Sequence, residues 1–147
     1  MMYDDANRGK ITNPERKRQL IDFSKLKYGK ITPTDIDGFI EKDNNMFMFY
    51  EYKLLDTDMP FGQRVAYTRL VDALTDAGKQ AVLFICRHNQ VDTNKEINGS
   101  DCIVDSYYFH GKWHPGRNKT AKELSDSFIR YTSRENGKTK RTTSHKS

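Results

Sequence analysis

The sequence predicts an α/β fold in which helices flank a mixed β-sheet. Short apolar runs of strand length, such as residues 81–86, alternate with a stretch over residues 61–77 in which apolar positions recur at helical spacing. The order strand, helix, strand favours a right-handed crossover that places two strands in one sheet. A hairpin ahead of this unit adds a strand of opposite direction, so we expect the sheet to be mixed.

The elements before the crossover are predicted from turn chemistry. Asn13 and Pro14 suit the cap and the first turn of a helix over residues 15–26. Residues 36–40 and 46–53 are predicted strands, and the short Asp/Asn-rich segment between them joins them into a hairpin. Because the second strand is apolar on both faces over its first five residues, we expect both faces to be covered.

The later elements follow from the same periodicities. A helix is predicted over residues 61–77, and Gly78 is its expected stop. Further strands are predicted over residues 81–86 and 102–109, and a last helix over residues 120–131. We expect one face of the helix over residues 61–77 to pack on the sheet. This face carries Gln63, Tyr67, Leu70 and Leu74.

Length and composition predict the domain organisation. The chain has 147 residues, of which 35% are hydrophobic, 12% aromatic and 31% charged, enough for one compact core with polar ends. We expect a single domain over residues 1–131 and a basic, irregular tail over residues 132–147. The formal net charge is +5, and residues 134–147 alone carry +4. Such a tail fits either a phosphate-binding surface or ordinary solvated charge.

Cysteine content and hydropathy argue against several other classes. Cys86 and Cys102 lack the short spacing of a zinc site or of a disulfide framework. No apolar run approaches the roughly 18–20 residues needed to cross a bilayer, and the polar N-terminus has no secretory core. We therefore expect a cytoplasmic protein with no membrane partner.

Chemistry is expected at the charged end of the second hairpin strand. Side chains alternate along a strand, so Glu51 and Lys53 project from one face, and the hairpin folds Asp37 back toward them. Carboxylates and a backbone carbonyl are hard oxygen ligands of the kind that Mg²⁺ prefers. Lys53 is then placed to orient a nucleophile or to stabilise charge on a phosphate. The Glu-x-Lys triplet alone fits an exposed ion pair equally well, and the upstream Asp favours the metal site.

Two upstream acids compete for the metal. The predicted turn places Glu51 opposite residue 36, which leaves Asp35 and Asp37 equally close. Gly38 leaves room for a substrate backbone directly beside Asp37. We therefore predict Asp37 as the bridging ligand and Asp35 as a secondary one.

The hairpin resembles the motif of the PD-(D/E)xK nuclease superfamily, through TDIDGFI at residues 34–40 and FYEYK at residues 49–53. That group includes type II restriction enzymes, lambda exonuclease, RecB-type nuclease domains and archaeal Holliday-junction resolvases. Gln63 and Tyr67 are similar to the Q-x-x-x-Y motif of RecB-type and lambda-exonuclease-type members, in which the Gln lies near the active site and the Tyr holds the helix or the substrate. Ile36 stands where the family motif has proline.

The resemblance covers about residues 14–86 and implies a three-layer-like sandwich with a restriction-endonuclease-like core. In some members an acid on the first helix completes the site. Glu15 is the best-placed candidate here, although a Glu at a helix start also stabilises the helix dipole. The implied cofactor is Mg²⁺ or Mn²⁺, bound by Asp37, Glu51 and the backbone carbonyl of Tyr52.

Several further residues are predicted to contact nucleic acid, namely Arg64, Tyr67, Arg69, Lys112 and Arg117. The two arginines of the helix fit a solvated face equally well. Trp113 is suited to stack on a base, but the sequence favours a role in anchoring the last helix to the core. His110 and His114 flank a glycine turn and lack a third metal ligand, so we expect them on the surface.

The sequence and the resemblance together predict a deoxyribonuclease that hydrolyses phosphodiester bonds in DNA with Mg²⁺ or Mn²⁺. A chain of this length has little room for a separate recognition domain, so cutting directed by structure or by ends is expected, with endonuclease and exonuclease activity both open. The alternative is an inactive nuclease fold that binds nucleic acid or a protein partner. Small chains of this kind are common in phages and mobile elements, and for a phage-encoded chain the expected location is the host cytoplasm.

Overall fold

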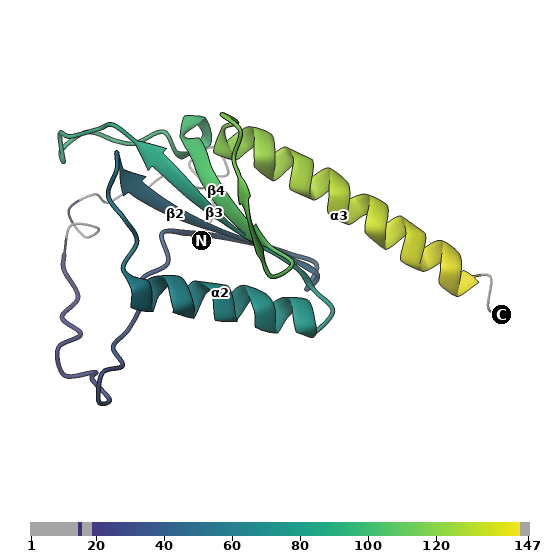
Figure 1. Ribbon diagram of the computed structural model, residues 1–147, viewed down its shortest axis with the longest axis horizontal. Helices are drawn as coiled ribbons and strands as arrows, with labels where there is room; N and C mark the ends of the chain where they lie inside the picture. The colour runs from purple at the N-terminus through teal and green to yellow at the C-terminus, as the bar shows by residue number, and fades with distance from the viewer. Residues whose placement is uncertain (1–14, 16–18, 145–147) are drawn as a thin grey trace, which may run out of the picture. The chain divides into compact units, whose positions relative to one another are not determined.

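The computed structural model describes residue 15, residues 19–135, and the backbone of residues 136–144. The chain divides into two compact units, residues 1–33 and residues 34–147. In the first unit, Tyr28 and Ile31 form an isolated antiparallel bridge, with N–H to carbonyl distances of 2.9 and 3.0 Å. The second unit holds the sheet and its helices (Figure 1).

The sheet of the second unit contains five strands among the described residues, in the order β1-β2-β3-β4-β5. They are β1 (Gly38–Lys42), β2 (Met46–Leu54), β3 (Gln80–His88), β4 (Ile103–Phe109) and β5 (Lys112–Pro115). β2 and β3 are parallel, and the other neighbours are antiparallel. The predicted α/β fold with a mixed sheet is confirmed.

Helix α2 (Phe61–Asp76) connects the two parallel strands, as the crossover prediction requires. Its buried residues are Tyr67 and Val71, which pack on the sheet. Gly78 has a φ of 85° and lets the chain leave the helix and enter β3, because glycine adopts this conformation without steric cost. The helix predicted over residues 61–77 is therefore confirmed to within one residue.

Helix α3 (Ala121–Ser144) begins with a capping box. The N–H of Glu123 donates to Oγ1 of Thr120 at 3.1 Å, and the N–H of Thr120 donates to Oε1 of Glu123 at 3.2 Å. The sequence predicted the helix to end at residue 131 and the chain to become irregular over residues 132–147. That prediction is wrong up to Ser144, because residues 132–144 contain no proline and a single glycine to stop the helix. Residues 145–147 lie outside the described part.

The sheet is covered on both faces, by α2 on one side and by α3 on the other (Figure 1). Met48 and Tyr50 of β2 pack with Phe128 of α3. Phe49, which points the opposite way, packs with Tyr67 of α2. Odd-numbered residues near the end of β2 therefore project toward α2. Within the described residues, no helix has the length and apolar character needed to cross a membrane.

The helix predicted over residues 15–26 is wrong for residues 19–26, which have no helical backbone. Its start at Asn13 and Pro14 lies outside the described residues. Leu20 is 98% exposed and Ile21 is 74% exposed, so the predicted apolar stripe is not packed. A short helix in water needs tertiary packing of its apolar face to persist.

Two strand predictions also need correction. The first strand begins at Gly38, so residues 36 and 37 precede it. The short strand β5 was not predicted, because its four residues contain a proline and no apolar run. It forms because His110 and Gly111, with φ of 49° and 74°, reverse the chain into a hairpin with β4.

Candidate functional site

The register of the hairpin determines which upstream acid faces Glu51. Gly38 pairs with Tyr50, so extending the register by one residue places Asp37 opposite Glu51. The sequence predicted residue 36 opposite Glu51, because the predicted centre of the turn lay slightly too early in the chain. With the observed register, strand pairing alone selects Asp37 over its neighbour Asp35.

Asp37 is fixed to β2 through its side chain. Its Oδ2 atom accepts a hydrogen bond from the backbone N–H of Tyr52 at 2.9 Å. The N–H and the carbonyl of one strand residue point to the same side, so the Tyr52 carbonyl also faces the region beyond the paired end of β1. Asp35 is exposed, and it contributes its backbone carbonyl, which accepts a hydrogen bond from Oη of Tyr67 at 3.0 Å.

Glu51 is the buried centre of the site, with only 3% of its surface exposed. Its Oε1 atom lies 3.1 Å from Nζ of Lys53 and accepts a hydrogen bond from Nε2 of Gln63 at 3.3 Å. Its Oε2 atom accepts a hydrogen bond from Oη of Tyr67 at 2.7 Å. Burying a carboxylate at the end of an apolar strand is costly unless it is paired, and these three donors provide the pairing.

The charge state of the site reflects this burial. Burial raises the pKa of Glu51, the hydrogen bond from Tyr67 lowers it, the nearby charge of Asp37 raises it, and Lys53 lowers it, with a net rise. Burial and the Glu51 carboxylate also raise the pKa of Tyr67, so its hydroxyl stays protonated and donates. Two carboxylates therefore repel each other across the hairpin, and a cation held by both would relieve the repulsion.

Lys53 and Gln63 complete a ring of contacts with Glu51. Nζ of Lys53 donates to Oε1 of Gln63 at 3.3 Å, while the amide nitrogen of the same Gln63 donates to Glu51. Gln63 lies in the first turn of α2, and the packing of that helix on the odd-numbered face of β2 brings it over the end of the strand. The side chain of Lys53 remains 16% exposed, which leaves its ammonium group access to a ligand.

The donor set suits a hard divalent cation. Asp37 and Glu51 offer carboxylate oxygens, and Tyr52 offers a backbone carbonyl. In the part of the chain that the structure describes, no three His, Cys, Asp or Glu side chains converge to hold a metal. A site with two carboxylates and one carbonyl leaves the remaining positions to water and substrate, and this is how Mg²⁺ is commonly bound.

Other predicted residues are not brought to this site. Lys112 begins β5, at the end of the sheet away from Glu51. Arg69 is exposed on α2, and Arg117 lies in the turn after β5. Glu15 belongs to the other unit and is exposed, so its role as a ligand stays a prediction.

Trp113 does not anchor the last helix, which corrects the prediction that the sequence favoured. It pairs with Tyr108 across the β4–β5 hairpin, with ring centroids 5.2 Å apart, and lies on the α2 face. Cζ of Arg64 lies 4.4 Å from the centroid of its indole ring. Phe109 makes the contact with α3 instead, because neighbouring strand residues alternate between faces.

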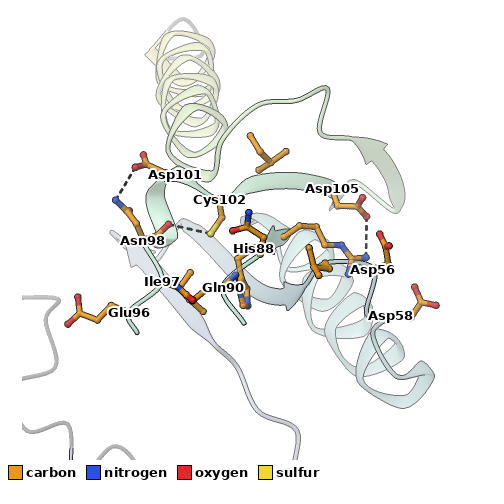
Figure 2. Close-up of a pocket in the computed structure, with 14 residues that line it drawn as sticks. Asp56, Asp58, His88, Gln90, Glu96, Ile97, Asn98, Asp101, Cys102 and Asp105 are labelled. Atoms are coloured by element: carbon orange, nitrogen blue, oxygen red, sulfur yellow. Dashed lines mark hydrogen bonds and ion pairs between the residues drawn. The ribbon is translucent and has the colours of Figure 1, made fainter. Parts of the chain in front are cut away.

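A hollow of about 740 Å³ lies at the C-terminal ends of β2 and β3, beside this site (Figure 2). His88 and Cys102 lie within it, and neither Glu51 nor Lys53 lines it. The acidic residues around it are Asp56, Asp58, Glu96, Asp101 and Asp105. Because these carboxylates repel phosphate, the hollow does not suit a nucleic-acid backbone.

Arg87 is a side chain near the site that the sequence analysis did not single out. It pairs with Lys53 in the β2–β3 register. Its guanidinium donates to the carbonyl of Thr57 and lies 3.6 Å from Oδ2 of Asp105. A signal was present, because Arg87 directly follows the apolar run at residues 81–86, just as the charged end of β2 follows its own apolar run.

The residues that carry the resemblance to PD-(D/E)xK nucleases lie together in this site, namely Asp37, Glu51, Lys53, Gln63 and Tyr67. Membership of that superfamily stays a prediction. Comparisons with protein-family models, with curated proteins and with solved structures gave no match.

Proposed function

We propose that this chain is a metal-dependent nuclease of the PD-(D/E)xK type, which hydrolyses phosphodiester bonds in DNA at ends or at particular structures. The observation that carries the proposal is the buried carboxylate of Glu51, held by Lys53, Gln63 and Tyr67 opposite Asp37. Burying such charges costs folding free energy, so stability alone does not explain them. Perturbed, converging charges are typical of reaction centres.

The proposed chemistry divides between the cofactor and the side chains. Bound Mg²⁺ or Mn²⁺ supplies charge stabilisation at the phosphate and lowers the pKa of water. Asp37, Glu51 and the Tyr52 carbonyl would hold the ion. Lys53 places a positive charge where negative charge develops on the phosphate, and Gln63 fixes the positions of Lys53 and Glu51 relative to each other.

The arrangement of elements supports the same proposal. The acids lie on an antiparallel hairpin, the following helix crosses over to a parallel strand, and helices cover both faces of the sheet. The sequence resemblance implies this arrangement for a restriction-endonuclease-like core, and we assign the fold to that core as part of the proposal.

Incubation with linear, circular, branched and single-stranded DNA, each with Mg²⁺, Mn²⁺ or EDTA, tests the proposal. Cleavage that requires a divalent ion would support it, and the substrate pattern would separate endonuclease from exonuclease activity. The same panel in RNA would define the sugar preference. A folded protein that cuts none of these substrates with either ion would contradict the proposal.

A second candidate is a nuclease-fold module that binds nucleic acid without cutting it. The observation in its favour is that both carboxylate oxygens of Glu51 already accept hydrogen bonds from protein side chains. A metal ion must therefore share or displace these contacts. Titration with Mn²⁺ separates the two candidates, because a binding module has no need of a metal site at the hairpin.

Gln63→Ala is expected to slow single-turnover cleavage by up to about a hundredfold, because Lys53 and Glu51 lose the amide that positions them. The free energy of unfolding should fall by less than about 1 kcal/mol, because the side chain is only half-buried. Thr75→Ala is a matched control, since its hydroxyl donates to the carbonyl of Val71 within α2 itself. Unchanged single-turnover rates in Gln63→Ala would remove Gln63 from the site.

Removing residues 134–147, which carry a net charge of +4, is expected to weaken DNA binding at low salt. The slope of log affinity against log salt should become shallower by about 0.9 for each phosphate that the shortened chain no longer neutralises. The shortened α3 keeps Thr132, whose Oγ1 lies 3.6 Å from Sδ of Met46, so the fold should persist. Cleavage at saturating DNA should be retained, whereas an unchanged slope would show that this segment does not bind DNA.

A further inference from the structure

A second hollow, of about 400 Å³, lies beside the proposed site on the α2 face of the sheet. This volume is within the range of small-ligand sites, roughly 300–1,000 Å³. Its walls include the guanidinium groups of two arginines and one indole ring. Its lining residues include Met59, Arg64, Ile85, Arg87, Asp105 and Trp113. We refer to this hollow as the Trp113 pocket.

The Trp113 pocket shares two elements with the proposed reaction centre. On β3, Ile85 pairs with Glu51 of the neighbouring strand, and paired strands lie only about 4.8 Å apart. On α2, Arg64 directly follows Gln63, which contacts Glu51. A ligand in the pocket is therefore next to the place where the scissile phosphate is proposed to lie.

The aromatic wall of the pocket is suited to stack a flat ring. Trp113 is half-buried, and the guanidinium that covers its face belongs to Arg64, an exposed side chain. Base-to-aromatic stacking generally contributes more free energy than an exposed cation–π contact. A nucleobase can therefore replace the guanidinium on the indole face, and Arg64 is then free to turn toward a phosphate.

The charges of the pocket point to a base rather than to a phosphate in its interior. Arg87 already lies 3.6 Å from Asp105 and also donates to the carbonyl of Thr57. Asp58 and Arg64 line the pocket as well, and their formal charges are opposite. With two arginines and two aspartates, the lining is formally neutral and favours an uncharged, planar group.

We propose that the Trp113 pocket binds one unpaired nucleobase adjacent to the scissile phosphate, stacked on Trp113 in place of the Arg64 guanidinium. The identity of the ligand as a nucleic-acid strand rests on the proposed function. A base inside a continuous duplex is paired and stacked, so it enters such a pocket only at a cost. Strand ends, branches and single strands are accordingly the favoured substrates.

Trp113 is the only tryptophan of the chain, so its fluorescence reports on the pocket. A short oligo(dT) added in EDTA, where metal-dependent cleavage does not occur, is expected to quench this fluorescence. An abasic oligomer with the same number of phosphates is expected to leave it unchanged. Trp113→Ala should weaken binding of labelled oligo(dT) by about fivefold or more, and Trp113→Phe should recover most of the loss.

Tyr131→Ala is the matched control, because it removes a part-exposed aromatic ring that contacts Phe109 on the α3 side of the sheet. Its binding of oligo(dT) should equal that of the wild type. Equal quenching by the abasic oligomer, or no quenching by oligo(dT), would overturn the proposal. These readouts use the wild-type chain, so they hold even if an alanine variant fails to fold.

The outcome is separable from that of the proposed function. Metal-dependent cleavage without base-dependent quenching would leave the nuclease standing and remove the Trp113 pocket. Base-dependent quenching in a chain that cuts no substrate would establish the pocket as a site for a nucleobase and would contradict the proposed nuclease.

Discussion

Glu51→Gln is expected to lower the single-turnover rate of DNA cleavage by about a hundredfold to a thousandfold or more. Glutamine keeps the shape of the side chain and can still accept the hydrogen bond of Tyr67, but it removes the charge that faces Lys53 and that would hold the metal ion in the proposed mechanism. Lys53→Ala should cause a loss of similar size. The measurement is cleavage of the best substrate at saturating Mg²⁺ or Mn²⁺.

The same substitution is expected to leave the Tm in EDTA unchanged or to raise it. Burial raises the pKa of Glu51 above its unfolded value, so the ionised form costs the folded state free energy. This cost is absent below the unfolded pKa and is fully present once the pH has risen above the folded pKa. Glutamine carries no charge, so it removes this free-energy cost at neutral pH. A gain in stability on loss of a charged site residue is a common trade-off between activity and stability.

Asp76→Asn is a suitable control for both measurements, because Asp76 is an exposed acid at the last residue of α2, at the opposite end of that helix from Gln63. It should change neither the rate nor the Tm. Full activity in Lys53→Ala would contradict the assignment of that residue. Unfolding of both the Glu51 and the Lys53 variants would instead show that the pair is structural.

Tyr67→Ala is expected to produce the largest loss of stability among these variants, about 3–5 kcal/mol. Tyr67 is 2% exposed and fills the space between α2 and the sheet together with Val71 and Phe49. Truncation leaves a cavity there. The expected fall in Tm is roughly 10 °C or more for a domain of this size.

Tyr67→Phe separates packing from hydrogen bonding at the same position. The ring remains, while Glu51 and the carbonyl of Asp35 lose the hydroxyl that they share. The expected cost is about 1–3 kcal/mol, because a buried carboxylate loses a donor. Urea unfolding measures the free energy of unfolding of both variants, and an unchanged m-value shows that the comparison with the wild type is valid. Equal stability of Tyr67→Ala and the wild type would contradict the packing described for α2.

The parts of the fold that the sequence predicted well are those with a strong local signal. The apolar run of β2 and the Asp/Asn-rich turn before it specify the hairpin. Apolar residues such as Tyr67 recur at helical spacing along α2, and this pattern specifies the crossover. Because these local signals also fix which side chains share a face, Glu51, Lys53 and Gln63 could be placed together from the sequence alone.

The parts that the sequence predicted poorly depend on non-local packing. The register of the hairpin was predicted one residue off, because a turn composition does not specify it, and the prediction of Asp37 over Asp35 rested on Gly38 instead. Trp113 was assigned to the wrong face, because β5 has no strand signal and is held in place by its pairing with β4. The apolar stripe at Leu20 gave a helical pattern without a surface to pack against.

The central claim, a divalent-metal site at the hairpin, is tested most directly by calorimetric titration with Mn²⁺. The wild type should bind, Asp37→Asn should remove tight binding, and Asp35→Asn should only weaken it, because the register places Asp37 opposite Glu51 while Asp35 contributes a backbone carbonyl. The reverse order would transfer the bridging role to Asp35. Absence of Mn²⁺ binding by the folded wild-type chain, or binding that neither Asp37→Asn nor Glu51→Gln alters, would contradict a metal centre at Asp37 and Glu51.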